Sequence, residues 1–203
     1  MIKNKLVTSS NKRLKEINLL EIIGAYRRCL YWFFSFPNIQ ISLSDLARNL
    51  NISKTSAREI VLDLVQEEFL LKEELGKVWR IFVNRNHFYN KTLKIIYNLE
   101  YIYLTLPYII KEINKIISNY RAIILFGSYR KGDDDENSDL DLAVEVFDDE
   151  DLSIIELGII PRIGYKKNIK VNIYKFSRNK IDINLFNNIA NGIILEGFLE
   201  VRP

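Results

Sequence analysis

The chain has 203 residues, a hydrophobic fraction of 48% and a formal net charge of +3. This length allows one large or two small domains, and the composition is that of an ordinary globular protein, which argues against a disordered chain. No apolar run reaches the roughly 18 residues that a membrane-spanning helix needs. No long apolar segment follows Met1–Lys5, so a secretory signal is not indicated. We therefore expect a cytoplasmic protein without a membrane partner.

The charge is unevenly distributed along the chain. Residues 1–90 contain 14 Lys and Arg against 9 Asp and Glu, whereas residues 91–203 contain 15 against 17. The net charge is therefore +5 in the first part and −2 in the second. A basic first part fits nucleic acid and an acidic second part fits cation binding, but many solvated surfaces share this asymmetry.

Residues 1–87 have the pattern of three helices followed by a hairpin. Apolar residues at helical spacing predict a first helix over residues 19–34, which Pro37 ends: Ile22, Ile23, Tyr26 and Leu30. Ser42 and Ser44 both offer an N-cap for a short second helix, and Ser42-x-x-Asp45 resembles a capping box. Ser53 is the expected N-cap of a third helix that extends to Glu67. The third helix is expected to bury Ala57, Ile60, Val61 and Leu64.

Two β-like runs follow at residues 69–72 and 78–83, and residues 73–76 are expected to form the tip of a hairpin. The order of three helices and a hairpin resembles the winged-helix DNA-binding family, and residues 46–53 resemble its turn region. The resemblance implies that the third helix enters the major groove of double-stranded DNA while the wing lies along the backbone. The DNA-contacting residues that it implies are Lys54, Thr55, Arg58, Lys77 and Arg80.

A second interpretation of this half stays open. Winged helices also mediate protein contacts or dimerisation, and Glu59 and Asp63 on the third helix weaken the attraction to DNA. His87, the only histidine, lies in a polar stretch and is expected to be structural or solvated.

Residues 88–119 are predicted to be a helical connector. Apolar residues recur on one face, and Pro107 is expected to kink or split the helix. Frequent tyrosines in this segment fit a packed connector or the interface of a homodimer.

Residues 120–203 contain the motifs that indicate chemistry. A short apolar run, residues 121–126, predicts a buried strand that ends at Gly127 and Ser128. A glycine lets the backbone approach a phosphate closely, and the serine adds a hydroxyl donor. The acidic loop 133–136 that follows is interpreted as a solvated turn.

The next strand carries two carboxylates on one face. Because side chains alternate along a strand, Leu140 and Leu142 share one face while Asp139 and Asp141 share the other. Two neighbouring carboxylates repel each other unless a cation neutralises them, and magnesium with substrate phosphates fits this arrangement. The alternative is a solvent-facing strand of an unrelated α/β domain.

The spacing from Gly127-Ser128 to Asp139-x-Asp141 resembles the minimal nucleotidyltransferases of the polymerase-beta superfamily. Arg130 and Lys131 fall in the segment where small members have a small residue and an arginine, and residues 186–197 resemble the closing helix and turn. The resemblance implies a small α/β domain with a mixed sheet, so that the whole chain is of the α+β class. It also implies Mg²⁺, catalytic and metal-binding roles for Asp139 and Asp141, and nucleotide contacts from Gly127, Ser128, Arg130 and Lys131.

One departure from the family pattern concerns a third carboxylate on a later strand. Asn172 stands where that aspartate is expected, and Asp182 comes too late in the chain to replace it. An amide is neutral and a poor base, so two-metal chemistry would be weakened while metal–nucleotide binding could survive.

Two functions follow from these patterns. The first is an enzyme that transfers a nucleotide, AMP from ATP above all, to a hydroxyl of a protein such as a toxin partner or of a small molecule. The second is a DNA-binding regulator whose nucleotidyltransferase domain has lost catalysis and senses nucleotides.

Overall fold

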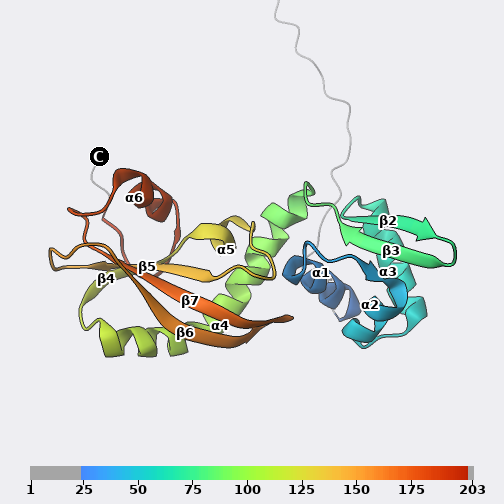
Figure 1. Ribbon diagram of the computed structural model, residues 1–203, viewed down its shortest axis with the longest axis horizontal. Helices are drawn as coiled ribbons and strands as arrows, with labels where there is room; N and C mark the ends of the chain where they lie inside the picture. The colour runs from blue at the N-terminus through green and yellow to red at the C-terminus, as the bar shows by residue number, and fades with distance from the viewer. Residues whose placement is uncertain (1–23, 201–203) are drawn as a thin grey trace, which may run out of the picture.

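The computed structural model describes residues 24–200, in two parts that lie side by side along the long axis of the molecule (Figure 1). The predicted start of the first helix, residues 19–23, lies outside the described residues. The first part contains α1 (Ala25–Ser35), β1 (Ile41–Ser42), α2 (Leu43–Leu50), α3 (Lys54–Gln66), β2 (Leu70–Leu75) and β3 (Val78–Val83). Within the described range, no helix is both long and apolar enough to cross a membrane.

Local capping explains where α2 and α3 begin. The Ser42 hydroxyl accepts a hydrogen bond from the backbone N–H of Asp45 at 3.2 Å, and Ser53 accepts one from Ser56 at 3.0 Å. Asn51 ends α2 in the left-handed conformation, φ 51°. The first core also encloses the single cysteine, and burial raises the pKa of the Cys29 thiol to about 12, which leaves it a packing residue.

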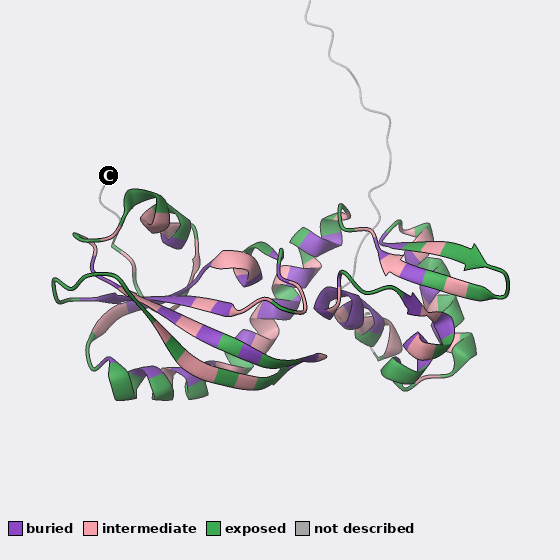
Figure 2. Ribbon diagram, in the orientation of Figure 1, coloured by how far each residue is buried: buried purple, intermediate pink, exposed green. Residues whose placement is uncertain are grey.

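A three-stranded antiparallel sheet, in the order β1-β3-β2, completes this part. The expected position of the hairpin tip was wrong, because β2 continues through residues 73–75 and the turn consists of Gly76 and Lys77. Glu73 lies opposite Arg80 and Glu74 opposite Trp79, so the acidic residues pair across the ribbon instead of forming its end. The exposed end of this hairpin projects from the molecule (Figure 2).

Helix α4 (Leu93–Ile116), which follows a short 3-10 turn, η2 (Phe88–Lys91), contributes to the cores of both parts. Tyr97 packs in the first core, whereas Ile102, Ile109 and Ile113 pack against the second sheet. Pro107 does not split the helix, which contradicts one of the two expectations for this residue. Packing of the turns on either side of Pro107 against the sheet offsets the backbone hydrogen bond that proline cannot donate.

The second part is built on a sheet of five strands, in the order β6-β7-β5-β4-β8, and the sheet is mixed, as predicted. Its strands are β4 (Tyr120–Leu125), β5 (Leu140–Val146), β6 (Ser153–Ile163), β7 (Lys166–Phe176) and β8 (Ile193–Gly197), with helices α5 (Gly127–Lys131) and α6 (Ile183–Ala190). Only β5 and β7 pair in parallel, and the other pairs are antiparallel.

The two faces of this sheet have different covers. Leu140 and Leu142 are fully buried in the core that α4 covers, which confirms the predicted alternation along β5. On the opposite face, Ala143 and Phe176 form a smaller core with Ile189 of α6. The face that carries Asp139 and Asp141 is therefore apolar only where α6 covers it.

The acidic loop was wrongly interpreted as a solvated turn. Asp134 is 0% exposed, and its carboxylate forms ion pairs with Lys166 at 2.5 Å and with Lys94 at 3.5 Å. Asn98 of α4 donates a further hydrogen bond to this carboxylate at 2.7 Å, and the Lys94 ammonium donates to the Asp134 carbonyl oxygen. One buried carboxylate thus joins α4, the loop and β7.

The substitution Asp134→Asn is expected to lower the free energy of unfolding by about 3 kcal/mol, because it leaves two buried ammonium groups without a counter-charge. Urea denaturation measures this loss. The control is Asp133→Asn, the same change at the adjacent exposed residue, which should shift the free energy of unfolding by no more than about 0.5 kcal/mol. Equal effects of the two substitutions would contradict the structural role of Asp134.

Candidate functional site

The predicted carboxylate pair lies where β5 begins, beside the parallel strand β7. Asp139 precedes the strand, Asp141 lies within it, and both side chains are half-buried. In the register of the parallel pair, Asp141 lies opposite Asn172. A residue from a strand 31 positions further along the chain therefore joins the two aspartates.

Asn172 contacts both carboxylates. Its side-chain Nδ2 donates a hydrogen bond to Asp139 Oδ2 at 3.3 Å and to Asp141 Oδ1 at 3.2 Å. Both oxygens are thus within hydrogen-bonding distance of a single atom. The amide donor satisfies part of the negative charge that the two aspartates bring together.

The electrostatics of Asp141 follow from this crowding. Burial raises the pKa of its carboxyl above the ordinary value, the hydrogen bond from Asn172 opposes this effect, and the charge of Asp139 adds to it. A group in this state gains from a cation, because the cation stabilises the charged form that burial and repulsion penalise.

Gly127 lies against the same carboxylate. Its φ is 72°, and a Cβ built at this position would lie 3.0 Å from Asp141 Oδ2. The backbone N–H of Phe126 donates to the Asp141 carbonyl oxygen at 3.3 Å, which fixes the end of β4 beside the start of β5. Only glycine combines this backbone conformation with so close an approach. Ser128, half-buried, follows it in the first turn of α5.

Comparison with known families bears on this region. Residues 110–198 match the family described as Polymerase beta, Nucleotidyltransferase. The match supports the resemblance seen in the sequence and a nucleotidyltransferase-type function for this part of the chain. It begins within α4, covers less than half of the 203 residues and includes Gly127, Asp139, Asp141 and Asn172. No curated protein matches the chain.

Asp139 and Asp141 offer two carboxylates to a metal ion. Among residues 24–200, no group of three His, Cys, Asp or Glu side chains is arranged to hold a metal ion. Two carboxylates fit the mode in which one or two protein carboxylates and substrate phosphates share the ion. The Oδ1 and Nδ2 atoms of the Asn172 amide are assigned from the hydrogen-bond network. A half-turn of this amide would place Oδ1, instead of Nδ2, beside the two carboxylates, where it could bind a cation. Asp182 takes no part, since its Oδ1 accepts from the N–H groups of Asn184 and Leu185 and so caps α6.

The predicted cations of the domain lie on α5. Arg130 is half-buried and Lys131 is exposed, and neither forms an ion pair with a residue in the range 24–200. Their charges are therefore not neutralised by the described part of the chain, although no contact joins them to Asp139 or Asp141.

Tyr174 is a residue of this site that the sequence interpretation missed. It lies on β7 two positions after Asn172, and its ring contacts Phe126 with centroids 4.9 Å apart. Burial raises the pKa of its hydroxyl, and the charges of Asp141 and Asp139 raise it further. The two-residue period of a strand could have identified it, because Asn172 and Tyr174 share one face.

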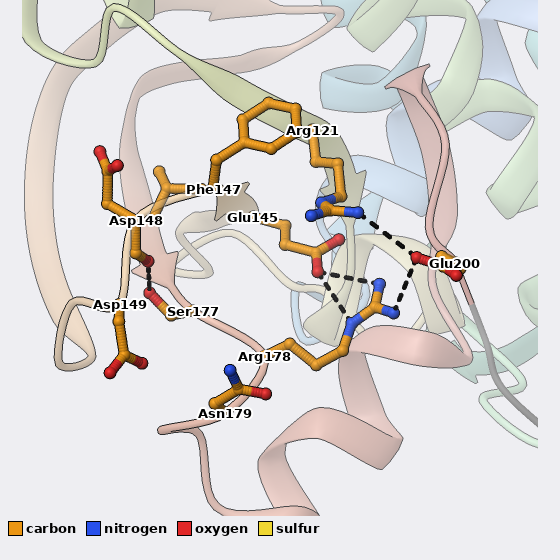
Figure 3. Close-up of a pocket in the computed structure, with 10 residues that line it drawn as sticks. Arg121, Glu145, Phe147, Asp148, Asp149, Ser177, Arg178, Asn179 and Glu200 are labelled. Atoms are coloured by element: carbon orange, nitrogen blue, oxygen red, sulfur yellow. Dashed lines mark hydrogen bonds and ion pairs between the residues drawn. The ribbon is translucent and has the colours of Figure 1, made fainter.

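A polar cavity of about 440 Å³ lies at the other end of β5 and β7 (Figure 3). Glu145 of β5 lines this cavity and lies four residues after Asp141, which corresponds to about 13 Å along the strand. Arg178 forms an ion pair with Glu145 at 2.9 Å, and both Arg178 and Arg121 reach Glu200. This network ties the C-terminal segment to the sheet, and we assign it a structural role.

The residues expected to contact DNA are only partly brought together. Lys54, Arg58 and Lys77 line one hollow of about 340 Å³ between α3 and the hairpin, with Trp79. The Arg58 guanidinium lies 5.4 Å from the centroid of the Trp79 ring. Thr55 is exposed on α3 but does not line this hollow, and Arg80 forms an ion pair with Glu73 at 3.4 Å. The winged helix-turn-helix interpretation stays a prediction.

His87 has a structural role, as expected. Its Nδ1 accepts a hydrogen bond from the backbone N–H of Tyr89 at 3.3 Å and so caps η2. Its ring contacts Phe69 and Phe88, with centroids 5.6 and 4.6 Å away.

Asp141→Asn is expected to stabilise the protein at neutral pH. A carboxyl whose pKa is raised by folding supports the folded state below its ordinary pKa, and this support is lost as the pH rises through the folded pKa. The variant should therefore exceed the wild type in free energy of unfolding at pH 7, with a difference that vanishes in acid. Urea denaturation over a pH series measures it, and Asp63→Asn, at an exposed position on α3, is the control. Destabilisation at pH 7 would contradict the assignment.

Proposed function

We propose that the nucleotidyltransferase domain binds a magnesium–nucleoside triphosphate and transfers its nucleotidyl group to a hydroxyl of a protein or small molecule. The observation that carries this proposal is the meeting of Asp139, Asp141 and Gly127 at one point of the sheet. The preference for ATP, and for a protein acceptor such as a toxin partner, rests on the family resemblance alone.

Each residue has a role that follows from its chemistry. Asp139 and Asp141 would hold Mg²⁺, which supplies charge neutralisation of the triphosphate and polarisation of its α-phosphate. Gly127 leaves room for a phosphate beside the backbone, and the Ser128 hydroxyl can donate to it. Arg130 and Lys131 add positive charge on the same short helix. The acceptor oxygen forms a bond to the α-phosphorus, the bond to pyrophosphate breaks, and the hydroxyl proton passes to solvent or a base.

Asn172 favours a second candidate, a DNA-binding regulator that senses nucleotides without catalysis. An amide cannot take the proton of an attacking hydroxyl, and in the described structure Asn172 uses its Nδ2 to bridge the two carboxylates. The hollow lined by Lys54, Arg58 and Lys77 supports the DNA-binding part of this candidate.

Calorimetric titration of Mg·ATP tests the nucleotide site. The wild type should bind, and Asp139→Asn/Asp141→Asn should weaken binding about 100-fold, because two charged ligands of the metal are lost. The control is Asp148→Asn/Asp149→Asn, which makes the same charge change at two exposed positions and should bind as the wild type does.

Pyrophosphate release from the same samples separates the two candidates. Release that depends on Asp139 and Asp141 supports the transferase. Binding without release supports the sensor, and Asn172→Asp should then restore some turnover. If the wild type does not bind Mg·ATP, both candidates are wrong about the nucleotide.

Fluorescence anisotropy with a mixed-sequence DNA duplex tests the basic hollow. Lys54→Gln/Arg58→Gln should weaken binding about tenfold or more and should reduce the slope of log affinity against log salt by about 2, since each phosphate contact contributes about one unit. Lys111→Gln/Lys167→Gln removes the same charge from exposed positions of the second part. Equal losses in the two double variants would show a non-specific effect of net charge.

A further inference from the structure

A pocket between the two parts of the molecule has a concentration of positive charge that neither proposed function uses. Its volume is about 220 Å³, and it is lined by Pro37 and Arg85 from the first part, by Lys91 and Lys94 from η2 and α4, and by Gly132 and Asp133 from the loop after α5. It is separate from Asp139 and Asp141, which are not among its lining residues.

Two of the three cations that line this pocket, Arg85 and Lys91, have no ion-pair partner within residues 24–200. Arg85 is exposed and donates a hydrogen bond to the neutral Asn38 side chain at 2.7 Å. Lys91 is exposed and forms no ion pair within residues 24–200. Lys94 must share the Asp134 carboxylate with Lys166, so this buried cluster has one more positive than negative charge.

Neighbouring charges change the pKa of Lys94. Burial lowers the pKa of the Lys94 ammonium, Asp134 raises it, and the charges of Lys166 and Arg85 lower it further. An anion beside Lys94 would relieve the same burial and repulsion. Asp133 is the one carboxylate that lines the pocket, and it leaves an excess of positive charge.

The walls of the pocket are closely packed. Gly132 adopts φ 76°, and a Cβ at this position would lie 2.3 Å from the carbonyl oxygen of Asn90. The loop after α5 therefore fits against η2 only because residue 132 is glycine. Lys91 and Lys94 flank the start of α4, a helix of 24 residues whose N-cap, Thr92, forms no capping hydrogen bond with its side chain. The positive end of the helix adds to the attraction for an anion.

We propose that this pocket binds a small phosphate-bearing anion and that the anion joins the two parts of the molecule. Arg85 and Lys91 donate to its oxygens, and Lys94 adds positive charge to the wall of the pocket. No metal is needed, because the cations come from the chain itself. A ligand that lies between Arg85 of the first part and Gly132 of the second stabilises the contact between the parts.

Calorimetry with inorganic pyrophosphate in the presence of EDTA is the test. EDTA removes the metal and so prevents metal-dependent binding at Asp139 and Asp141. An absence of pyrophosphate binding in EDTA would therefore contradict this proposal without contradicting the proposed function. The full-length wild type should bind, and Lys91→Gln and Arg85→Gln should each lower the affinity about tenfold, as expected for the loss of one charged hydrogen bond. Pyrophosphate should also raise the melting temperature of the wild type more than that of either variant.

Lys111→Gln, which removes one exposed positive charge from the other end of α4, is the matched control and should bind as the wild type does. Displacement of pyrophosphate by ATP in EDTA would identify a nucleotide as the source of the phosphate, and displacement by a DNA duplex would identify the nucleic-acid backbone. No binding by the wild type, or an equal loss in Lys111→Gln, would overturn the proposal.

Discussion

The structure of the second part depends on one buried carboxylate. Asp134 lies between the ammonium groups of Lys94 and Lys166, and all three side chains are almost completely buried. Charges removed from water are tolerated only when they are paired and hydrogen-bonded, so α4, the acidic loop and β7 must keep their relative positions. Because this loop leads directly into β5, the same constraint positions Asp139.

The functional consequence is that strand register sets the position of Asp141, whereas Asp139 lies just before the strand, at the end of the anchored loop. Asp141 and Asn172 lie opposite each other in the parallel pair of β5 and β7, and Gly127 approaches Asp141 from the end of β4. Burial and repulsion penalise the charged form of Asp141. The charged form of Asp141 therefore lowers the stability of the folded state at this point. The hydrogen bonds that Asn172 donates to the two carboxylates reduce that penalty.

Patterns with a local cause could be predicted from the sequence. The alternation at Leu140 and Leu142 follows from the two-residue period of a strand, and Ser42 and Ser53 signal helix starts through contacts three residues away. The role of Asp134 could not be predicted, because it is one of four consecutive acidic residues and its lysine partners lie 40 and 32 positions away. Helix α4 continues through Pro107 because of packing against a distant sheet, which no local pattern records. Tyr174 could have been found from its spacing to Asn172.

The central claim is that Asp139, Asp141 and Asn172 form the place where a metal–nucleotide binds. The most direct measurement is paramagnetic broadening of backbone amide NMR signals by Mn²⁺ with ATP. The account predicts that the signals of Gly127, Ser128 and residues 139–141 broaden first, together with that of Asn172, and that Asp139→Asn/Asp141→Asn abolishes this pattern. Broadening centred elsewhere, or the same pattern in the double variant, would contradict it.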